Sequence, residues 1–398
     1  MTVIKKYIFF SVFVLVSIML TGQEIQNFRP QQIVSPEISN GNVTFRIVAK
    51  DAKEVMLYGS WMSSFTAREN LVKDAEGVWS ITINAPAPEI YTYNFIVDNL
   101  SVNDNANIFV QRDGRRLLSI LLIDGPLTSN YREANKRGNL DHVWYDSPTI
   151  GLTRRMFVYT PFEYNNSNTK YPVLYLHHGG GGDEDAWSNM GRACQILDNL
   201  IEQGKAVPMI VVMPNGNAGQ QAAQTLFLPE KTFENNEPST ANQGYLTNEG
   251  NIFINSIVKD IIPYIESNYR VIADSKHRAI SGLSMGGGHS YYTGLRNLDL
   301  FSAIGVFSTG LFGMSSDAPT YDPESEIPGV IANLKKWNDA SSLFYISCGE
   351  NDPRIEPTRR VVKRFRDAGL NIEFTVLPGG HEWHFWRKSL TEFVQKIF

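Results

Sequence analysis

Two patterns of apolar residues divide the chain. Between residues 28 and 124, apolar and polar residues alternate in short runs, as in strands that bury one face. Strands are predicted at 43–47, 54–58, 78–83, 91–97 and 116–123, with turn signals such as Glu76-Gly77 and Pro86 to Pro88 between them. Short strands at regular spacing predict an immunoglobulin-like β-sandwich over residues 28–124.

From residue 139 on, near-continuous apolar runs alternate with amphipathic stretches. Antiparallel edge strands are predicted at 142–145 and 154–161, and buried strands at 171–177, 208–214, 279–283, 303–308 and 343–349. Strands buried on both faces of a sheet have this apolar composition. A helix is predicted at 251–269, with one apolar face of Ile254, Ile257, Val258, Ile261, Ile262 and Ile265. The alternation predicts an α/β three-layer sandwich over residues 139–398.

Three polar stretches do not fit regular elements. Residues 125–138 contain Pro126 and mixed charges and are predicted to be a linker. Residues 215–249 and 310–328 are long loops, which in compact domains are often functional. We expect them to form walls of the substrate cleft, with Phe227, Phe233 and Tyr245 as aromatic candidates.

The amino terminus has the features of a signal peptide. Lys5-Lys6 precede an apolar run over residues 7–20, and Thr21-Gly22-Gln23 end it with small and polar residues. This arrangement predicts a signal peptide over residues 1–23, and so a secreted or periplasmic protein without a membrane anchor in its mature form. A retained anchor is the alternative, although the run is short for a membrane span.

Composition excludes several classes of partner. The chain has 398 residues, 42% of them hydrophobic, and a net charge of −5, so nothing favours nucleic acid or an anionic membrane surface. Its two cysteines, Cys194 and Cys348, are expected to be free thiols rather than a disulfide. No Cys/His cluster has the spacing of zinc ligands, so no metal is expected.

The sequence Gly282-Leu283-Ser284-Met285-Gly286 follows an apolar strand and precedes a run of small residues. This order is typical of a nucleophile elbow, a sharp strand-to-helix turn that exposes the serine hydroxyl at the sheet edge. Glycines on both sides of the serine let strand and helix approach closely. We therefore predict that Ser284 is a nucleophile.

Candidates for the base and its partner follow in the order Ser, Asp, His that α/β-hydrolases use. Asp352 follows the strand at 343–349, and His381 follows the next predicted strand. Both thus lie beyond carboxyl ends of strands, where open α/β sheets place their sites. Glu350 is an alternative to Asp352, and His384 is an alternative to His381.

A glycine loop, Gly179 to Gly182, follows the strand at 171–177. An early loop of this kind supplies one backbone N–H of the oxyanion hole, and the residue after the nucleophile supplies the other. The predicted donors are Gly180 and Met285. His178 is expected to support the loop, and Trp383 and Trp386 to pack behind His381.

The second domain resembles carbohydrate esterase family one, the feruloyl esterase and acetyl xylan esterase group related to esterase D. The resemblance lies in the stretches 171–182, 204–214, 281–287, 348–352 and 380–386. It implies an α/β-hydrolase fold, a serine esterase without metal or cofactor, and ester substrates on plant-cell-wall xylan. The family pattern places the base directly after the glycines, at His381. One departure is His177, where many relatives have an apolar residue.

The first domain resembles the early-set domains of carbohydrate-binding module family forty-eight. The resemblance lies in the stretches 43–46, 77–80, 91–98 and 103–104. Some members bind glucans or xylans, and others only pack on a catalytic domain. Trp61 is the candidate platform for a sugar ring, whereas Trp79 is expected in the core.

The resemblance and the residues together favour a feruloyl esterase acting on feruloylated xylan through an acyl-enzyme on Ser284. An acetyl xylan esterase uses the same machinery on acetylated xylan and is the first alternative. An esterase of iron-chelator esters is less favoured. A xylan- or glucan-binding protein with an inactive hydrolase domain is the alternative from another class. The sequence does not reveal the acyl pocket or the residues that bind the substrate.

Overall fold

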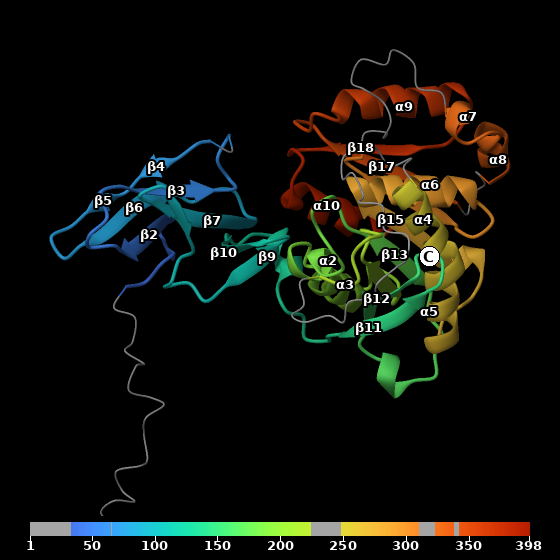
Figure 1. Cartoon of the computed structure of the whole chain (residues 1–398), viewed down its shortest axis with the longest axis horizontal. Helices are drawn as coiled ribbons and strands as arrows, with labels where there is room; N and C mark the ends of the chain where they lie inside the picture. Colours follow the sequence, from blue (N-terminus) through green and yellow to red (C-terminus); the bar gives the residue numbers. More distant parts are fainter. Residues whose placement is uncertain (1–32, 65, 224–247, 310–322, 338–341) are drawn as a thin grey trace, which may run out of the picture. The chain divides into compact units, whose positions relative to one another are not determined.

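The computed structural model describes residues 33–64, 66–223, 248–309, 323–337 and 342–398 (Figure 1). The predicted signal peptide, 1–23, lies outside these residues, as do Phe227, Phe233 and Tyr245 of the predicted cleft loop. The chain divides into two compact units. The smaller holds the described residues up to Tyr58, with Met62–Ala85 and Asn94–Ile108, and the larger holds Gly59–Trp61, Pro86–Tyr93 and Phe109–Phe398.

The smaller unit consists of antiparallel strands, as the alternating pattern predicts. One sheet has the order β1-β2-β6-β5, formed by Glu37–Ser39, Asn42–Val48, Val78–Asn84 and Val72–Lys73. In addition, β3 (Val55–Gly59) pairs with β4 (Glu69–Asn70), and the second half of β7 (Ile90–Val97) pairs with β8 (Leu100–Val102). In β2, the buried side chains of Val43, Phe45 and Ile47 alternate with side chains that are more exposed. Trp79 is buried as expected, and its indole N–H donates to the Ala49 carbonyl.

The larger unit begins with segments that precede its main sheet. The first half of β7 pairs with β10 (Arg116–Leu122), and β10 pairs with β9 (Val110–Asp113). The predicted linker, 125–138, contains the short helix η1 (Thr128–Tyr131), and Tyr131 and Ala134 are buried. The half-buried Trp61 packs its ring edge-on against Tyr91. Its binding of sugar stays a prediction.

The eight-stranded sheet of the larger unit has the order β11-β12-β14-β13-β15-β16-β17-β18. The strands β11 and β12 are antiparallel to their neighbours, and the other strands run parallel to one another. This mixed sheet confirms the predicted α/β-hydrolase architecture. In chain order the strands are Asn139–Ser147, Leu152–Thr160, Val173–His177, Ile210–Pro214, Arg278–Leu283, Ala303–Phe307, Leu343–Gly349 and Glu373–Leu377.

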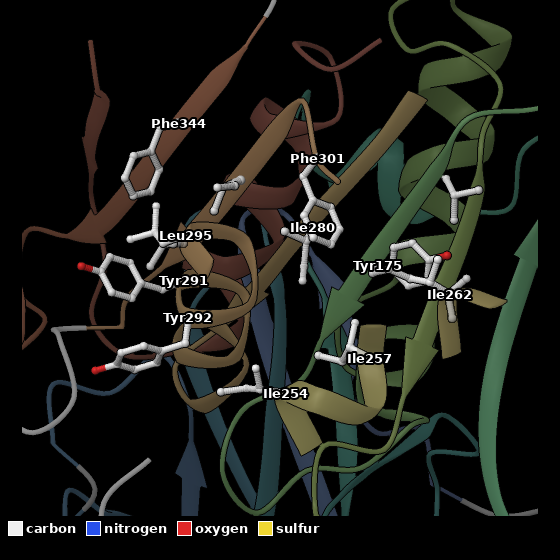
Figure 2. Close-up of a cluster of buried hydrophobic side chains, with 14 of the residues drawn as sticks. Tyr175, Ile254, Ile257, Ile262, Ile280, Tyr291, Tyr292, Leu295, Phe301 and Phe344 are labelled. Carbon is white, nitrogen blue, oxygen red and sulfur yellow. The ribbon is translucent and has the colours of Figure 1, made fainter. Parts of the chain in front are cut away.

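Helices pack on both faces of this sheet, because successive side chains of each buried strand point to opposite faces. Tyr175 joins one core cluster, whereas Leu174 and Leu176 join the other. Figure 2 shows the first cluster, where side chains of the sheet meet isoleucines and tyrosines of helices. Its helices are α4 (Asn248–Ser256), η3 (Ile257–Ile261), α5 (Ile262–Asn268), α6 (Met285–Arg296), α8 (Val330–Trp337) and α9 (Ile355–Asp367).

The second cluster involves α2 (Ala186–Asn189), α3 (Ala193–Glu202) and α10 (Trp383–Phe393). Short elements complete the described chain: η2 (Tyr164–Asn166), η4 (Ser275–His277) and α7 (Pro323–Glu326). Across the part of the chain that the structure describes, none of the helices combines the length and the apolar composition that a membrane span requires.

The helix predicted at 251–269 is interrupted by a π-helical turn, η3, between α4 and α5. A π turn inserts an extra residue into the helical repeat and so rotates the face that follows. Val258, predicted on the apolar face, lies within the turn and is only half-buried, whereas the five isoleucines are buried. Within the turn, the buried carboxylate of Asp260 accepts hydrogen bonds from the Ser147 hydroxyl (2.5 Å) and the Thr149 hydroxyl (2.9 Å).

A buried ion pair within the larger unit joins its early residues to α10. The Arg387 guanidinium donates to Glu89 Oε1 from Nε (3.2 Å) and Nη2 (2.9 Å). It also donates to the carbonyls of Ile90 and Met190, both at 2.8 Å. The two charged side chains are only 2% and 4% exposed. Removing one partner would therefore leave a buried charge without its counterion.

We predict that Glu89→Gln lowers the free energy of unfolding by about 3–5 kcal/mol, the usual cost of breaking a buried pair. Urea unfolding followed by tryptophan fluorescence measures the change. Asp124→Asn is the matched control, because Asp124 and Arg132 form a solvent-exposed ion pair. Exposed ion pairs contribute about 0–1 kcal/mol to the free energy of unfolding. Equal losses in the two variants would contradict the prediction.

Candidate active site

Ser284 lies in a strained turn between β15 and α6. Its backbone angles are φ 49° and ψ −114°, and residues other than glycine rarely adopt such a positive φ. The backbones of strand and helix approach each other so closely here that a Cβ on Gly282 would lie 2.5 Å from the Gly286 carbonyl carbon. A Cβ on Gly286 would lie 2.4 Å from the His178 carbonyl oxygen. The elbow geometry thus requires both glycines, as predicted.

Hydrogen bonds from the neighbouring strand hold the turn. The Ser284 N–H donates to the Phe307 carbonyl (2.9 Å), and the buried Thr309 hydroxyl lies 3.1 Å from the Ser284 carbonyl. A strained residue costs about 1–3 kcal/mol and persists only when its surroundings fix it. Thr309 has no motif around it in the sequence, so its contribution emerges only from the structure.

The three predicted side chains come together beyond the carboxyl ends of β15, β17 and β18. His381 Nε2 lies 3.0 Å from Ser284 Oγ, and His381 Nδ1 lies 2.8 Å from Asp352 Oδ2. The Asp352 side chain is fully buried, and the His381 side chain is 25% exposed. An imidazole between a hydroxyl and a carboxylate can take the hydroxyl proton and activate the oxygen as a nucleophile.

The surroundings of Asp352 keep it ionised. Burial acts to raise the pKa of Asp352, but hydrogen bonds from His381 and from the Arg354 N–H outweigh it, so the pKa lies below its usual value. Asp352 is therefore a carboxylate at neutral pH. In that form it accepts the Nδ1 proton of His381 and leaves Nε2 facing the serine.

The two alternative residues occupy other places. Glu350 is exposed, whereas Asp352 accepts the bond from His381. His384 pairs instead with Glu382, with His384 Nε2 2.9 Å from Glu382 Oε1. The same carboxylate oxygen accepts the Gly380 N–H at 2.7 Å. Glu382, which the sequence analysis does not single out, thus fixes the turn that carries His381.

Tryptophans support the His381 ring. Trp386 contacts it edge-on with ring centroids 4.9 Å apart, and Trp383 packs edge-on against Trp386 at 5.2 Å. Trp187 continues the row, 5.5 Å from Trp383. This confirms the expected packing of Trp383 and Trp386 behind His381. The rings restrict the imidazole to the orientation that serves Ser284.

The glycine loop lies beside the elbow because β13 and β15 are adjacent in the sheet. A Cβ on Gly179 would lie 3.2 Å from Ser284 Cβ. Met285 is the first residue of α6, where backbone N–H groups have no partner within the helix. Both predicted donors are thus carried by segments next to Ser284. That Gly180 and Met285 bind an oxyanion stays a prediction.

His178 connects this loop to the segment after β14. Its Nε2 accepts the Gly216 N–H at 2.7 Å, so Nδ1 carries the proton that bonds the Gly179 carbonyl at 2.8 Å. Burial lowers the pKa of His178 and keeps the ring neutral. The residue therefore supports the loop, as expected, and does not compete with His381.

Two further histidines and both cysteines of the larger unit lie in surroundings that keep their side chains uncharged. Burial lowers the pKa of His289 to about 3 and holds the pKa of His177 well below its usual value. Cys194 and Cys348 are free, as expected, and burial raises the pKa of each thiol to about 12. Among the described residues, no group of three or more His, Cys, Asp or Glu side chains could hold a metal ion.

Known proteins resemble this chain in sequence and in fold. The model of the family named Esterase matches residues 147–397. An endo-1,4-β-xylanase/feruloyl esterase of Xylanibacter ruminicola is 31% identical over 368 residues, which cover 90% of this chain and 45% of that protein. The chain thus spans about half the length of this curated relative.

Two solved structures extend the comparison. A CE1 ferulic acid esterase from Anaeromyces mucronatus, in complex with ferulic acid, has a TM-score of 0.52 and 23% identity over 70% of this chain and 98% of that one. The enterobactin esterase of Shigella flexneri has a TM-score of 0.64 and 14% identity over 90% of this chain and 94% of that one. At these identities both establish the fold alone.

We predict that Thr309→Val lowers the free energy of unfolding by about 0.5–1.5 kcal/mol, because the Ser284 carbonyl keeps the Gly288 N–H but loses the Thr309 hydroxyl, its second hydrogen-bond donor. Thr309→Ser keeps the hydroxyl and should lose less. Urea midpoints of the two variants measure the difference. If valine is tolerated as well as serine, the hydroxyl does not hold the elbow.

We predict that Asp352→Asn lowers kcat for 4-nitrophenyl acetate by about 10⁴-fold, because an amide cannot stabilise the His381 imidazolium. Glu350→Gln is the control and should retain kcat within about two-fold. Initial rates at pH 7.5 measure both. The reverse ranking of the two variants would identify Glu350 as the partner of His381.

Proposed function

Because the chain belongs to the Esterase family, we propose that it hydrolyses feruloyl or related hydroxycinnamoyl esters of plant-cell-wall xylan. The observation that carries the chemistry is the bridge made by His381, 3.0 Å from the Ser284 hydroxyl and 2.8 Å from the Asp352 carboxylate. A hydroxyl, imidazole and carboxylate in this order serve acyl transfer in serine hydrolases.

The acylation half of the reaction begins at Ser284. Its Oγ attacks the ester carbonyl carbon as His381 Nε2 removes the hydroxyl proton. The carbonyl oxygen becomes an oxyanion, which the N–H groups of Gly180 and Met285 stabilise. When this intermediate collapses, the bond to the sugar oxygen breaks, and His381 returns the proton to that oxygen. Ser284 then carries the acyl group as an ester.

Deacylation repeats the steps with water. His381 takes a proton from a water molecule, whose oxygen attacks the acyl carbon. Collapse of the second intermediate breaks the bond to Ser284 Oγ, which regains its proton from His381. The products are a carboxylic acid and the free enzyme. Asp352 remains ionised throughout and stabilises the imidazolium in both halves.

The names of relatives support the feruloyl substrate. The Xylanibacter relative carries xylanase and feruloyl esterase in its name, and the Anaeromyces structure holds ferulic acid. An acetyl xylan esterase would use the same three side chains with a smaller acyl pocket. We also propose that the protein is exported, since Lys5-Lys6 and the apolar run after them form a signal peptide pattern.

The decisive experiment compares the protein with Ser284→Ala on methyl ferulate, feruloylated arabinoxylan oligosaccharide and 4-nitrophenyl acetate. We predict that the unaltered protein releases ferulate and that Ser284→Ala lowers kcat by about 10⁴-fold or more. Ser281→Ala is the matched control, because Ser281 is also buried but lies within β15. Chromatography of ferulic acid measures turnover.

Each result has a distinct meaning. Turnover of the acetate ester alone, still dependent on Ser284, would retain the mechanism and identify a deacetylase. If the folded protein binds xylan but hydrolyses no ester, the proposed esterase activity is refuted, and a carbohydrate-binding function is favoured.

A further inference from the structure

The glycine loop needs support from outside itself. Gly179 to Gly182 have no side chains, and Gly181 has a φ of +78°, so the loop has many accessible backbone conformations. Yet the loop lies against Ser284, and a displaced N–H group loses its contact with an oxyanion. Some other part of the larger unit must therefore restrain it.

One side of the loop is attached to the segment after β14. Asn217 Nδ2 donates to the Gly182 carbonyl at 2.8 Å, and Gly216 bonds His178 as described above. The buried Glu184 carboxylate pairs with Arg155 (2.7 Å) and accepts the Ala223 N–H (2.7 Å). These contacts fix one side and leave Asp183 and Asp185, on either side of Glu184, to be held from elsewhere.

Arg112, in β9, holds the other side. Its guanidinium donates to both oxygens of Asp183, from Nη1 at 2.8 Å and from Nη2 at 2.6 Å. It donates to Asp185 Oδ2 from Nη2 at 2.7 Å and from Nε at 3.2 Å. The three side chains are only 6–20% exposed. Residues 112, 183 and 185 all belong to the larger unit.

The turn between β9 and β10 lies on the loop itself. A Cβ on Gly114 would lie 2.7 Å from the Gly181 carbonyl oxygen, so the two backbones are in contact. Arg112 Nη1 also donates to the Gly114 carbonyl at 2.8 Å. All five N–H donors of the guanidinium are thus used, and the same residue fixes the turn and the acidic residues that follow the loop.

Charge provides a second reason for this arrangement. Asp183, Glu184 and Asp185 are consecutive and follow directly after a loop predicted to face a developing negative charge. Uncompensated carboxylates would repel one another and that charge. Arg112 is shared by Asp183 and Asp185, and Arg155 pairs with Glu184, so the two guanidinium groups offset two of the three negative charges. A lysine is a single point of charge and cannot form this fork.

We infer that Arg112 is a positioning residue, which holds the Gly179 to Gly182 loop where the Gly180 N–H meets the oxyanion. The inference rests on the proposed ester hydrolysis but not on the acyl group. By this inference the hairpin of β9 and β10 supports the active site, although it precedes β11, the first strand of the main sheet, in the chain.

The test uses the full chain and 4-nitrophenyl acetate. We predict that Arg112→Met lowers kcat by about 10–100-fold with KM within about two-fold, because loss of one oxyanion donor costs about 10²–10³-fold and the loop is displaced rather than deleted. Arg112→Lys should recover part of the rate. Arg116→Met is the matched control, since Arg116 pairs with Asp113 on the same hairpin but is 69% exposed.

Two further readouts separate positioning from loss of folded protein. Complete reaction with diethyl 4-nitrophenyl phosphate releases one 4-nitrophenol per active serine, and kcat is calculated per titrated site. A trifluoromethyl ketone forms a tetrahedral oxyanion on serine, so its inhibition constant should rise by the same factor as kcat/KM falls. A variant that only unfolds would have fewer titrated sites but unchanged constants for each.

The outcomes distinguish the inference from the proposed function. Unchanged kcat per site and an unchanged inhibition constant in Arg112→Met, with the unaltered protein active, would overturn the inference alone. Activity on the acetate ester but not on methyl ferulate would refute the feruloyl substrate and leave the test of Arg112 valid. If no ester is hydrolysed and no serine titrates in the unaltered protein, both are refuted.

Discussion

The site depends on a close approach between the elbow and the end of β13. At Gly282 and Gly286 there is no room for a Cβ, since backbone atoms of Gly286, His177 and His178 lie within 3 Å of its position. A third glycine, Gly287, makes room for the Thr309 hydroxyl, which would lie 1.7 Å from a Cβ there. This contact places Ser284 above the sheet edge and beside the glycine loop. Side chains at these positions would separate the two segments and with them the nucleophile and its oxyanion donors.

Burial gives the polar groups around this contact fixed roles. Asp352 is fully buried but ionised because it is hydrogen-bonded, whereas His178 and His289 are buried and neutral. The site thus contains several imidazoles, and His381 is the one that is partly exposed and lies between a carboxylate, Asp352, and the Ser284 hydroxyl. Water and substrate can reach that ring, and the neutral rings behind it serve as hydrogen-bond partners or as packing. Environment, rather than residue type, selects the base.

Local patterns predict the parts of this protein whose causes are local. The alternation in β2, the apolar strands of the large sheet and the elbow at Ser284 all depend on neighbours within a few residues, and the structure agrees with them. The order of Ser284, Asp352 and His381 follows from the fold that those strands imply. The π turn in 251–269 could not be predicted, because it accompanies the contacts of Asp260 with Ser147 and Thr149, more than 100 residues away.

Distant partners also explain why the sequence pattern does not identify Arg112 as a functional residue. Its partners lie 71 and 73 residues away, and neither β9 nor the three acidic residues has a motif. The polar composition of 125–138 predicts a linker, yet Tyr131 and Ala134 are buried among residues of the larger unit. A few apolar side chains decide the packing of such a segment, and composition averages them out.

The pair of Glu89 and Arg387 has a consequence for synthesis of the chain. The two residues are separated by 298 positions, so Glu89 is made long before its partner exists. At translation rates of roughly 5–20 residues per second, the interval is about 15–60 seconds. Throughout it the Glu89 carboxylate, which directly precedes β7, lacks the counterion with which it is buried in the folded unit, so burying it is costly. The larger unit therefore completes its core late, once α10 is available, and chaperones have this interval in which to bind the growing chain.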